Sequence, residues 1–189
     1  MSQLAERQVV AGRHTSLARS ERTVTEGGSA AAADPAAWPP RVLLVSSSGG
    51  HLAQLARLEG WWSTRERLWV TFPGCDTDSL LQDEEVVMAH HPTTRNVPNA
   101  ARNLRLAARV LRSYRPQLVV STGAGVAFPF FVAAKGLGIR SVYLEVYDRI
   151  DVPTLTGRLC YPFADLFLLQ WEEQRRHYPR GVVIGSVFG

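Results

Sequence analysis

A histidine follows two glycines where the first apolar run of the chain ends. Ser48, Gly49, Gly50 and His51 come shortly after the aliphatic segment 42–45. Glycines let a ligand approach the backbone closely, the first amides of a helix attract anions, and an imidazole titrates near neutral pH. A glycine pair before a helix is more often only a tight turn. The added histidine favours a site in which His51 is a general base and Ser48, Gly49 and Gly50 contact a phosphate.

Two common nucleotide-binding motifs are absent from this turn. A dinucleotide fingerprint needs G-x-G-x-x-G and an acidic residue about 20 positions later, whereas the second apolar run ends at Phe72 and Pro73. A P-loop needs Gly-Lys followed by Ser or Thr, which does not occur here. The adjacent pair His90 and His91 would point to opposite faces of a strand and has no cysteine or acidic partner at a useful spacing. We therefore expect neither a metal nor a cofactor.

A second glycine-rich turn follows another apolar run, over residues 118–121. Gly123 and Gly125 bracket one alanine there, and they would leave room for a phosphate or a sugar beside the backbone. A purely structural turn explains the same pattern equally well.

A carboxylate ends a third apolar run. Glu145 follows the segment 141–144, where it could accept hydrogen bonds from sugar hydroxyls or orient His51, and a solvated loop acid is the alternative. Arg149 lies four residues further on, where it could pair with a phosphate or, more simply, with its neighbour Asp148.

A row of arginines marks the longest helix that the sequence predicts, over Pro98–Tyr114. Its apolar face is expected to consist of Leu104, Ala107, Ala108 and Leu111. The row itself consists of Arg102, Arg105, Arg109 and Arg112. A basic amphipathic helix can lie against anionic lipid, with about 1 kcal/mol from each arginine. A solvated helix face is the commoner explanation, and nucleic acid is not expected because no aromatic residues are interleaved with the arginines.

Short apolar strands alternate with helices from residue 41 onward. Strands are expected over 42–45, 68–72, 85–88, 118–121, 141–144, 166–169 and 182–184, and further helices after His51 and over 78–84, 128–137, 154–161 and 172–177. This alternation predicts an open, doubly wound α/β sheet with parallel strands and helices on both faces. Ligands bind beyond the carboxyl ends of such strands, so the two glycine turns and Glu145 should meet at one edge.

Composition is compatible with one globular domain and a polar tail. The chain has 189 residues, of which 46% are hydrophobic and 20% charged, and its formal net charge is +4. Residues 1–40 contain few large apolar side chains, so we expect a disordered tail there and a folded domain over 41–189. No apolar run approaches the roughly 20 residues of a membrane-spanning helix. We expect a peripheral protein on the cytoplasmic face of a membrane.

The ordered part of the chain resembles the acceptor-side subunit of bipartite GT-B glycosyltransferases. That group includes the eukaryotic membrane-anchoring subunit of the enzyme that adds the second N-acetylglucosamine to dolichol-linked oligosaccharide, and the bacterial PssD-like exopolysaccharide proteins. The N-terminal domain of MurG is similar at a greater distance. The resemblance rests on segments 47–51, 121–125, 143–145 with Arg149, 155–159, 161–165, 170–171 and Gly185. The family's usual Ile/Leu-Glu-Ser is replaced here by Leu144, Glu145 and Val146.

The resemblance implies a Rossmann-like N-terminal half of a GT-B fold that is inactive without a partner chain. The partner, in a heterodimer, would bind a UDP-sugar. The two chains would then transfer N-acetylglucosamine, glucose or glucuronate to a polyprenyl- or dolichyl-phosphate-linked saccharide. His51 and Glu145 are the expected catalytic residues. Alternatives are a non-catalytic scaffold that recruits the partner to the membrane, a complete nucleotide-sugar enzyme such as an epimerase, and a nucleic-acid-binding module.

Overall fold

The computed structural model describes residues 41–188 and shows a single sheet of seven parallel strands. The disordered tail predicted for residues 1–40 lies outside the described residues. The strands are β1 (Arg41–Val45), β2 (Glu66–Thr71), β3 (Val86–Met88), β4 (Leu118–Ser121), β5 (Arg140–Leu144), β6 (Leu166–Leu169) and β7 (Val182–Val183). Their spatial order is β3-β2-β1-β4-β5-β6-β7. This is the doubly wound arrangement that the sequence predicts, and the order reverses between β1 and β4.

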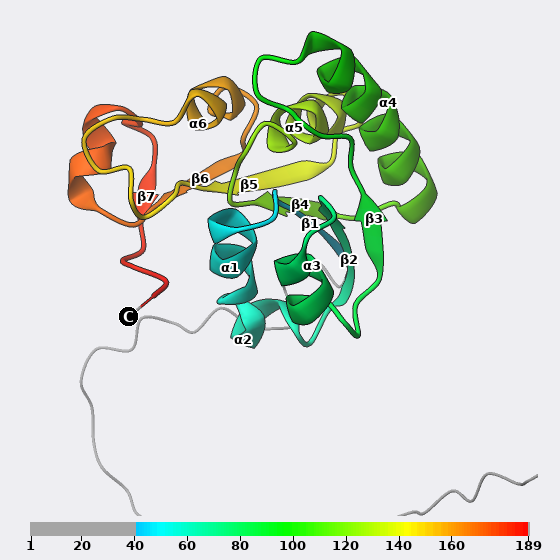
Figure 1. Ribbon diagram of the computed structural model, residues 1–189. Helices are drawn as coiled ribbons and strands as arrows, with labels where there is room; N and C mark the ends of the chain where they lie inside the picture. The colour runs from blue at the N-terminus through cyan, green and yellow to red at the C-terminus, as the bar shows by residue number, and fades with distance from the viewer. Residues whose placement is uncertain (1–40, 189) are drawn as a thin grey trace, which may run out of the picture. The chain divides into compact units, whose positions relative to one another are not determined.

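Helices cover both faces of the sheet (Figure 1). The helices are α1 (Gly50–Ala56), α2 (Glu59–Trp62), α3 (Cys75–Leu80), α4 (Val97–Tyr114), α5 (Ala127–Gly136), α6 (Leu155–Cys160) and the 3-10 helix η2 (Glu172–Arg176). Helices α1, α2 and α3 lie on one face, and α4, α5 and α6 lie on the other, as the predicted alternation requires. Among the described residues, no helix has the length and apolar character needed to cross a bilayer.

Two helix predictions were wrong in their bounds. The helix expected over 78–84 is α3, which begins at Cys75, directly after Gly74. The spacing of Leu52, Leu55 and Leu58 predicts a helix through Leu58, but α1 ends at Ala56 and α2 follows as a separate turn. The break lets Trp62 turn inward, where its Nε1 donates to the Leu55 carbonyl at 3.0 Å and its ring meets Trp69 edge-on at 5.4 Å. The Leu55 carbonyl also accepts from the Leu58 N–H at 3.2 Å, so two donors close the end of α1.

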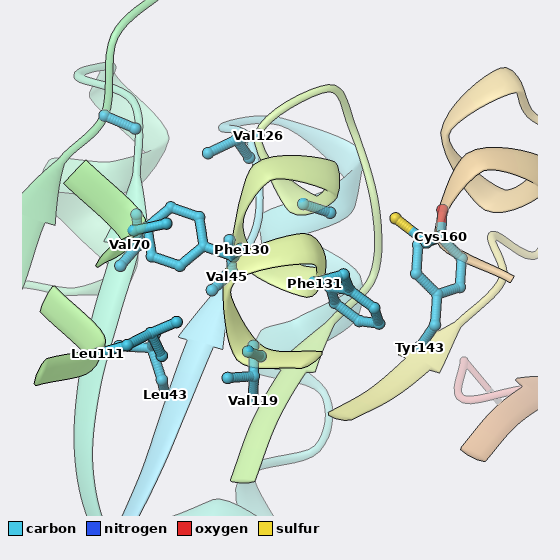
Figure 2. Close-up of a cluster of buried hydrophobic side chains, with 14 of the residues drawn as sticks. Leu43, Val45, Val70, Leu111, Val119, Val126, Phe130, Phe131, Tyr143 and Cys160 are labelled. Atoms are coloured by element: carbon cyan, nitrogen blue, oxygen red, sulfur yellow. The ribbon is translucent and has the colours of Figure 1, made fainter. Parts of the chain in front are cut away.

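The larger core lies between the sheet and the layer of α4, α5 and α6. Figure 2 shows Phe130 and Phe131 of α5 above Val45, Val119 and Tyr143 of the strands. Both phenylalanines are fully buried. Helix α5 is apolar on nearly all sides because it lies between α4 and α6 on top of the sheet. It therefore fixes the loop that precedes it, which carries Gly123 and Gly125.

One predicted core residue of α4 is exposed. Leu104 is 42% exposed, although Ala107 and Leu111 are buried as expected. The helix is rotated so that Asn99 and Asn103 face inward instead. These two amides hydrogen-bond the chain that connects β3 to α4, which compensates the cost of burying them. The spacing of apolar residues cannot predict that polar side chains such as Asn99 and Asn103 are buried.

Candidate functional site

His51 lies in the first turn of α1 and is held by the loop after β4. Its Nδ1 lies 2.7 Å from the carbonyl oxygen of Thr122, and the Thr122 hydroxyl donates to the His51 carbonyl at 2.7 Å. Thr122 is fully buried, and the imidazole is half-buried. The two reciprocal bonds join β1–α1 to β4–α5 across the point where the strand order reverses. This is where an open parallel sheet places its ligands.

The bond to Thr122 fixes the tautomer of the imidazole. A carbonyl oxygen can only accept, so Nδ1 must carry the proton and the lone pair of the neutral ring lies on Nε2. Burial lowers the pKa of His51 below its ordinary 6.5, against the opposing effects of the Thr122 bond and of Asp148. The ring is therefore neutral at pH 7, with Nε2 ready to accept a proton.

The glycines after β4 accommodate protein atoms. Gly123 has φ 112°, and a Cβ there would lie 2.6 Å from the Tyr143 hydroxyl and 3.1 Å from Cε1 of His51. A Cβ on Gly125 would lie 2.8 Å from the side chain of Thr93. The missing side chains at these two positions thus make room for protein atoms, which is the structural reading of this turn. The sequence could not name these neighbours, because they are distant along the chain.

The turn before α1 is the open part of the site. No atom lies within 4 Å of a Cβ built on Gly49 or Gly50, and Ser48 beside them is half-exposed. Gly49 has φ 82°, which a residue with a side chain rarely adopts. Its N–H donates to the carboxylate of Asp76 in α3. A phosphate that uses this amide would have to replace Asp76.

Glu145 is fully buried, and protein groups hold its carboxylate. The carboxylate accepts hydrogen bonds from the Tyr178 hydroxyl at 2.5 Å, the Thr154 hydroxyl at 3.0 Å and the Val146 N–H at 3.1 Å. Burial raises the pKa of Glu145 above its ordinary 4.5, and these three hydrogen bonds oppose that shift. The backbone of Gly157 in α6 lies against the same carboxylate and leaves no room for a side chain.

The expectation that Glu145 orients His51 was wrong. Thr122 holds the ring, and among the described residues no hydrogen bond joins Glu145 to His51. Glu145 instead fastens α6, since Thr154 is the N-cap of that helix. The carboxylate has no free lone pair directed at solvent, so sugar hydroxyls are not its partners in this structure.

The loop that carries Arg149 is fixed by amide side chains that the sequence did not single out. Gln174 of η2 donates to the carbonyls of Val146 and Arg149 at 3.0 and 3.1 Å. Gln170 donates to the Glu145 carbonyl at 2.8 Å. Arg149 itself is exposed, and no ion pair of the described chain joins it to Asp148, so the simpler expected pairing is not formed. The sequence did not indicate that Gln170 and Gln174 bind loop carbonyls, because most glutamines in proteins are exposed to solvent.

The arginine row lies on the outer surface of α4. Arg102, Arg105, Arg109 and Arg112 are all exposed, and none is part of an ion pair within residues 41–188. The segments that form α4, α5 and α6 contain no aspartate or glutamate. These helices therefore carry a net positive charge, most of it on α4, because Lys135 of α5 pairs with Asp165 at 3.3 Å. The three helices also expose Val97, Leu155 and Leu159 at 78%, 69% and 42%.

The chain matches a model of the family described as "Oligosaccharide biosynthesis protein Alg14 like" over residues 88–187. A rat protein named UDP-N-acetylglucosamine transferase subunit ALG14 is 24% identical over 177 residues, which is 77% of this chain and 82% of the relative. The protein of the same name from Eremothecium gossypii is 33% identical over 182 residues, or 79% and 81% of the two chains.

A third relative matches only part of the chain. It is named UDP-N-acetylglucosamine--N-acetylmuramyl-(pentapeptide) pyrophosphoryl-undecaprenol N-acetylglucosamine transferase, from Symbiobacterium thermophilum. It is 36% identical over 83 residues, or 44% of this chain and 21% of the relative.

This chain spans less than half the length of the solved structures of similar fold that it matches. MurG of Acinetobacter baumannii superposes with a TM-score of 0.60 at 18% identity, covering 71% of this chain and 43% of that one. UDP-N-acetylglucosamine 2-epimerase of Rickettsia bellii gives 0.63 at 13% identity, covering 80% and 46%. At these identities the likeness concerns the fold alone. It confirms the predicted Rossmann-like half of a GT-B fold.

Proposed function

The chain belongs to the Alg14-like family of oligosaccharide biosynthesis proteins, and on this premise we propose that it is the acceptor-side subunit of a two-chain glycosyltransferase. Its relatives are named as subunits of a UDP-N-acetylglucosamine transferase, which supports both the reaction and a partner chain. The partial relative is named for a pyrophosphoryl-undecaprenol acceptor, which supports an acceptor saccharide on a polyprenyl phosphate.

In this proposal residues 41–189 form the acceptor-side domain, and the partner binds the donor. The donor is a UDP-sugar carrying N-acetylglucosamine, glucose or glucuronate. The chain alone would be inactive, because GT-B enzymes react their two substrates in a cleft between two domains. This chain spans less than half the length of the similar solved structures, which supports a second domain supplied by the partner.

The observation that carries the proposal is the hydrogen bond from His51 to the Thr122 carbonyl. It leaves Nε2 unprotonated at the switch point of the sheet. Nε2 removes the proton from the acceptor hydroxyl as the oxygen attacks the anomeric carbon of the donor. The bond from that carbon to the UDP oxygen breaks, UDP leaves, and the configuration is inverted. Such general base catalysis contributes about 10²–10⁴-fold to a rate.

The other residues of the edge have supporting roles in this mechanism. The open turn of Ser48, Gly49 and Gly50 receives part of the acceptor, in competition with Asp76. Arg149, on its amide-fixed loop, lies on the β5 side of the same edge and contributes a positive charge. Glu145 positions that loop and α6 from inside the domain and does not touch substrate.

The cationic layer of α4, α5 and α6 is proposed to face the membrane that carries the acceptor. A layer without carboxylates is attracted to anionic lipid, and its exposed leucines can enter the interface. The arginine row, Arg102 to Arg112, would lie nearest the lipid phosphates. The contact is peripheral and on the cytoplasmic side, where anionic lipid is enriched.

The test is sugar transfer by this chain reconstituted with its donor-binding partner. His51→Gln should lower kcat by about 10²–10⁴-fold while the two chains still co-purify. His90→Gln is the matched control, since that exposed imidazole lies in another loop. A scaffold that only recruits its partner would behave differently: His51→Gln would retain full activity, and charge removal along the arginine row would abolish it on vesicles.

A further inference from the structure

The connection between β3 and α4, residues 89–96, is polar yet rigidly held. Asn103 of α4 is fully buried and forms two bonds with one residue of this loop: its Oδ1 accepts from the His90 N–H at 2.9 Å, and its Nδ2 donates to the His90 carbonyl at 2.8 Å. Asn99, also buried, donates to the Pro92 carbonyl at 2.9 Å. Two buried amides thus fix a surface loop whose own side chains are largely exposed.

The hydrogen bonds of Asn99 and Asn103 hold this loop beside the candidate site. Thr93 fills the space beside Gly125. Gly125 is two residues from Gly123, where an added Cβ would lie 3.1 Å from Cε1 of the His51 ring. Thr93 therefore packs against the same β4–α5 loop that borders the imidazole, and Arg95 follows Thr93 by two residues.

Arg95 is an exposed cation without an anionic partner. It has φ 51°, a backbone conformation that side-chain-bearing residues seldom adopt. None of the ion pairs or side-chain hydrogen bonds within residues 41–188 involves it. Neither its loop nor α4 contains a carboxylate that could neutralise it. Arg95 thus carries an unpaired charge in a loop that packs against Gly125 of the candidate site and that the two asparagines hold at His90 and Pro92.

We propose that Arg95 binds a phosphate of the acceptor, so that the enzyme selects a saccharide linked to a phosphate or diphosphate. The inference rests on the proposed function and adds a residue to it. In an acceptor with a single sugar, that sugar separates the reacting hydroxyl from the phosphate. A base and a cation on neighbouring loops could then bind the two ends of the acceptor. A guanidinium forms charge-assisted, often bidentate bonds with phosphate oxygens.

The experiment compares two acceptors in the reconstituted enzyme. One is N-acetylglucosamine on a short polyprenyl diphosphate, and the other is the same sugar on a neutral alkyl glycoside. Arg95→Asn is the informative variant, because asparagine tolerates a positive φ and the loop keeps its shape. Arg115→Asn is the matched control: Arg115 has φ 53°, is exposed, and caps the opposite end of α4.

Arg95→Asn should lower kcat/KM for the diphosphate acceptor by about ten- to hundredfold, mainly through KM, and leave the neutral acceptor unchanged. Arg95→Lys should recover part of the loss, and Arg115→Asn should change neither acceptor. The inference is overturned if Arg95→Asn keeps the preference for diphosphate, or if it impairs both acceptors equally, which would indicate a structural role.

A binding measurement separates this inference from the proposed function. The diphosphate acceptor is titrated into the purified chain, without partner or donor. Weaker binding by Arg95→Asn than by Arg115→Asn supports the phosphate contact. If the wild-type pair transfers no sugar, that separate result rejects only the proposed function. Equal binding by both variants and wild type rejects the role of Arg95.

Discussion

Replacing Gly123 by alanine should damage both stability and catalysis. The new Cβ would lie 2.6 Å from the Tyr143 hydroxyl, closer than real Cβ atoms approach, and 3.1 Å from Cε1 of His51, which is a tight contact. Tyr143 is fully buried between Phe131 and Phe167, so its ring has no free space to move into. The His51 ring is bound to Thr122 and would lose that bond if it moved.

The magnitude follows from two separate costs. A φ of 112° is strained for alanine, which costs on the order of 1–3 kcal/mol. Overpacking beside Tyr143 costs typically 1–3 kcal/mol more. Gly123→Ala should therefore lower the free energy of unfolding by about 2–6 kcal/mol. The rate of sugar transfer should fall further than the folded fraction does, because the proposed base is displaced.

Urea unfolding followed by circular dichroism measures the stability, and transfer by the reconstituted pair measures the activity. Gly136→Ala is the control: this helical glycine has no positive φ, and its Cβ would meet no atom within 4 Å. It should be neutral or stabilising by up to about 1 kcal/mol. If Gly123→Ala unfolded at the wild-type urea concentration and remained active, the close packing of Gly123, Tyr143 and His51 would be refuted.

Three further predictions concern ionisable groups. Burial lowers the pKa of His51, so the unfolded chain binds the imidazole proton more tightly than the folded chain, and stability should fall as the pH drops below 6.5. Nuclear magnetic resonance should give a pKa under 6.5 for His51 in the folded protein. A value above 6.5 would contradict the burial of the ring. Burial raises the pKa of Glu145, so the stability of the wild type relative to Glu145→Gln should decline as the pH rises above 4.5. Urea unfolding of both proteins at several pH values measures this difference. The same pH dependence in both proteins would contradict the raised pKa. The double variant Arg105→Gln/Arg109→Gln should bind phosphatidylglycerol vesicles about thirtyfold more weakly, at about 1 kcal/mol per arginine, and unchanged co-sedimentation would exclude the arginine row from the membrane contact.

The fold could be predicted from the sequence because hydrophobic patterning decides it. Aliphatic runs such as 42–45 and 118–121 became central strands, and the alternation with helices specified parallel pairing. Helix bounds were less well determined. The separate turn of α2 depends on Trp62 reaching the Leu55 carbonyl, a contact that no local pattern reveals.

The site could be predicted only in part. The sequence placed His51 correctly at an edge where parallel strands end, because its position follows from topology. The partners of each residue could not be predicted in the same way. Glu145 looked like a substrate ligand because it follows a buried strand, yet the hydroxyls of Thr154 and Tyr178 and the Val146 N–H donate to its carboxylate inside the protein. Gly125 resembled a ligand-binding glycine, and Thr93 occupies its space.

The most direct test of a two-chain site is to assay each purified chain alone and then the mixture, with a UDP-sugar donor and a polyprenyl-diphosphate-linked acceptor. The mixture should transfer sugar, and each chain alone should transfer none. Tight binding of the UDP-sugar and its turnover by this chain alone would contradict the central claim that the partner supplies the donor side.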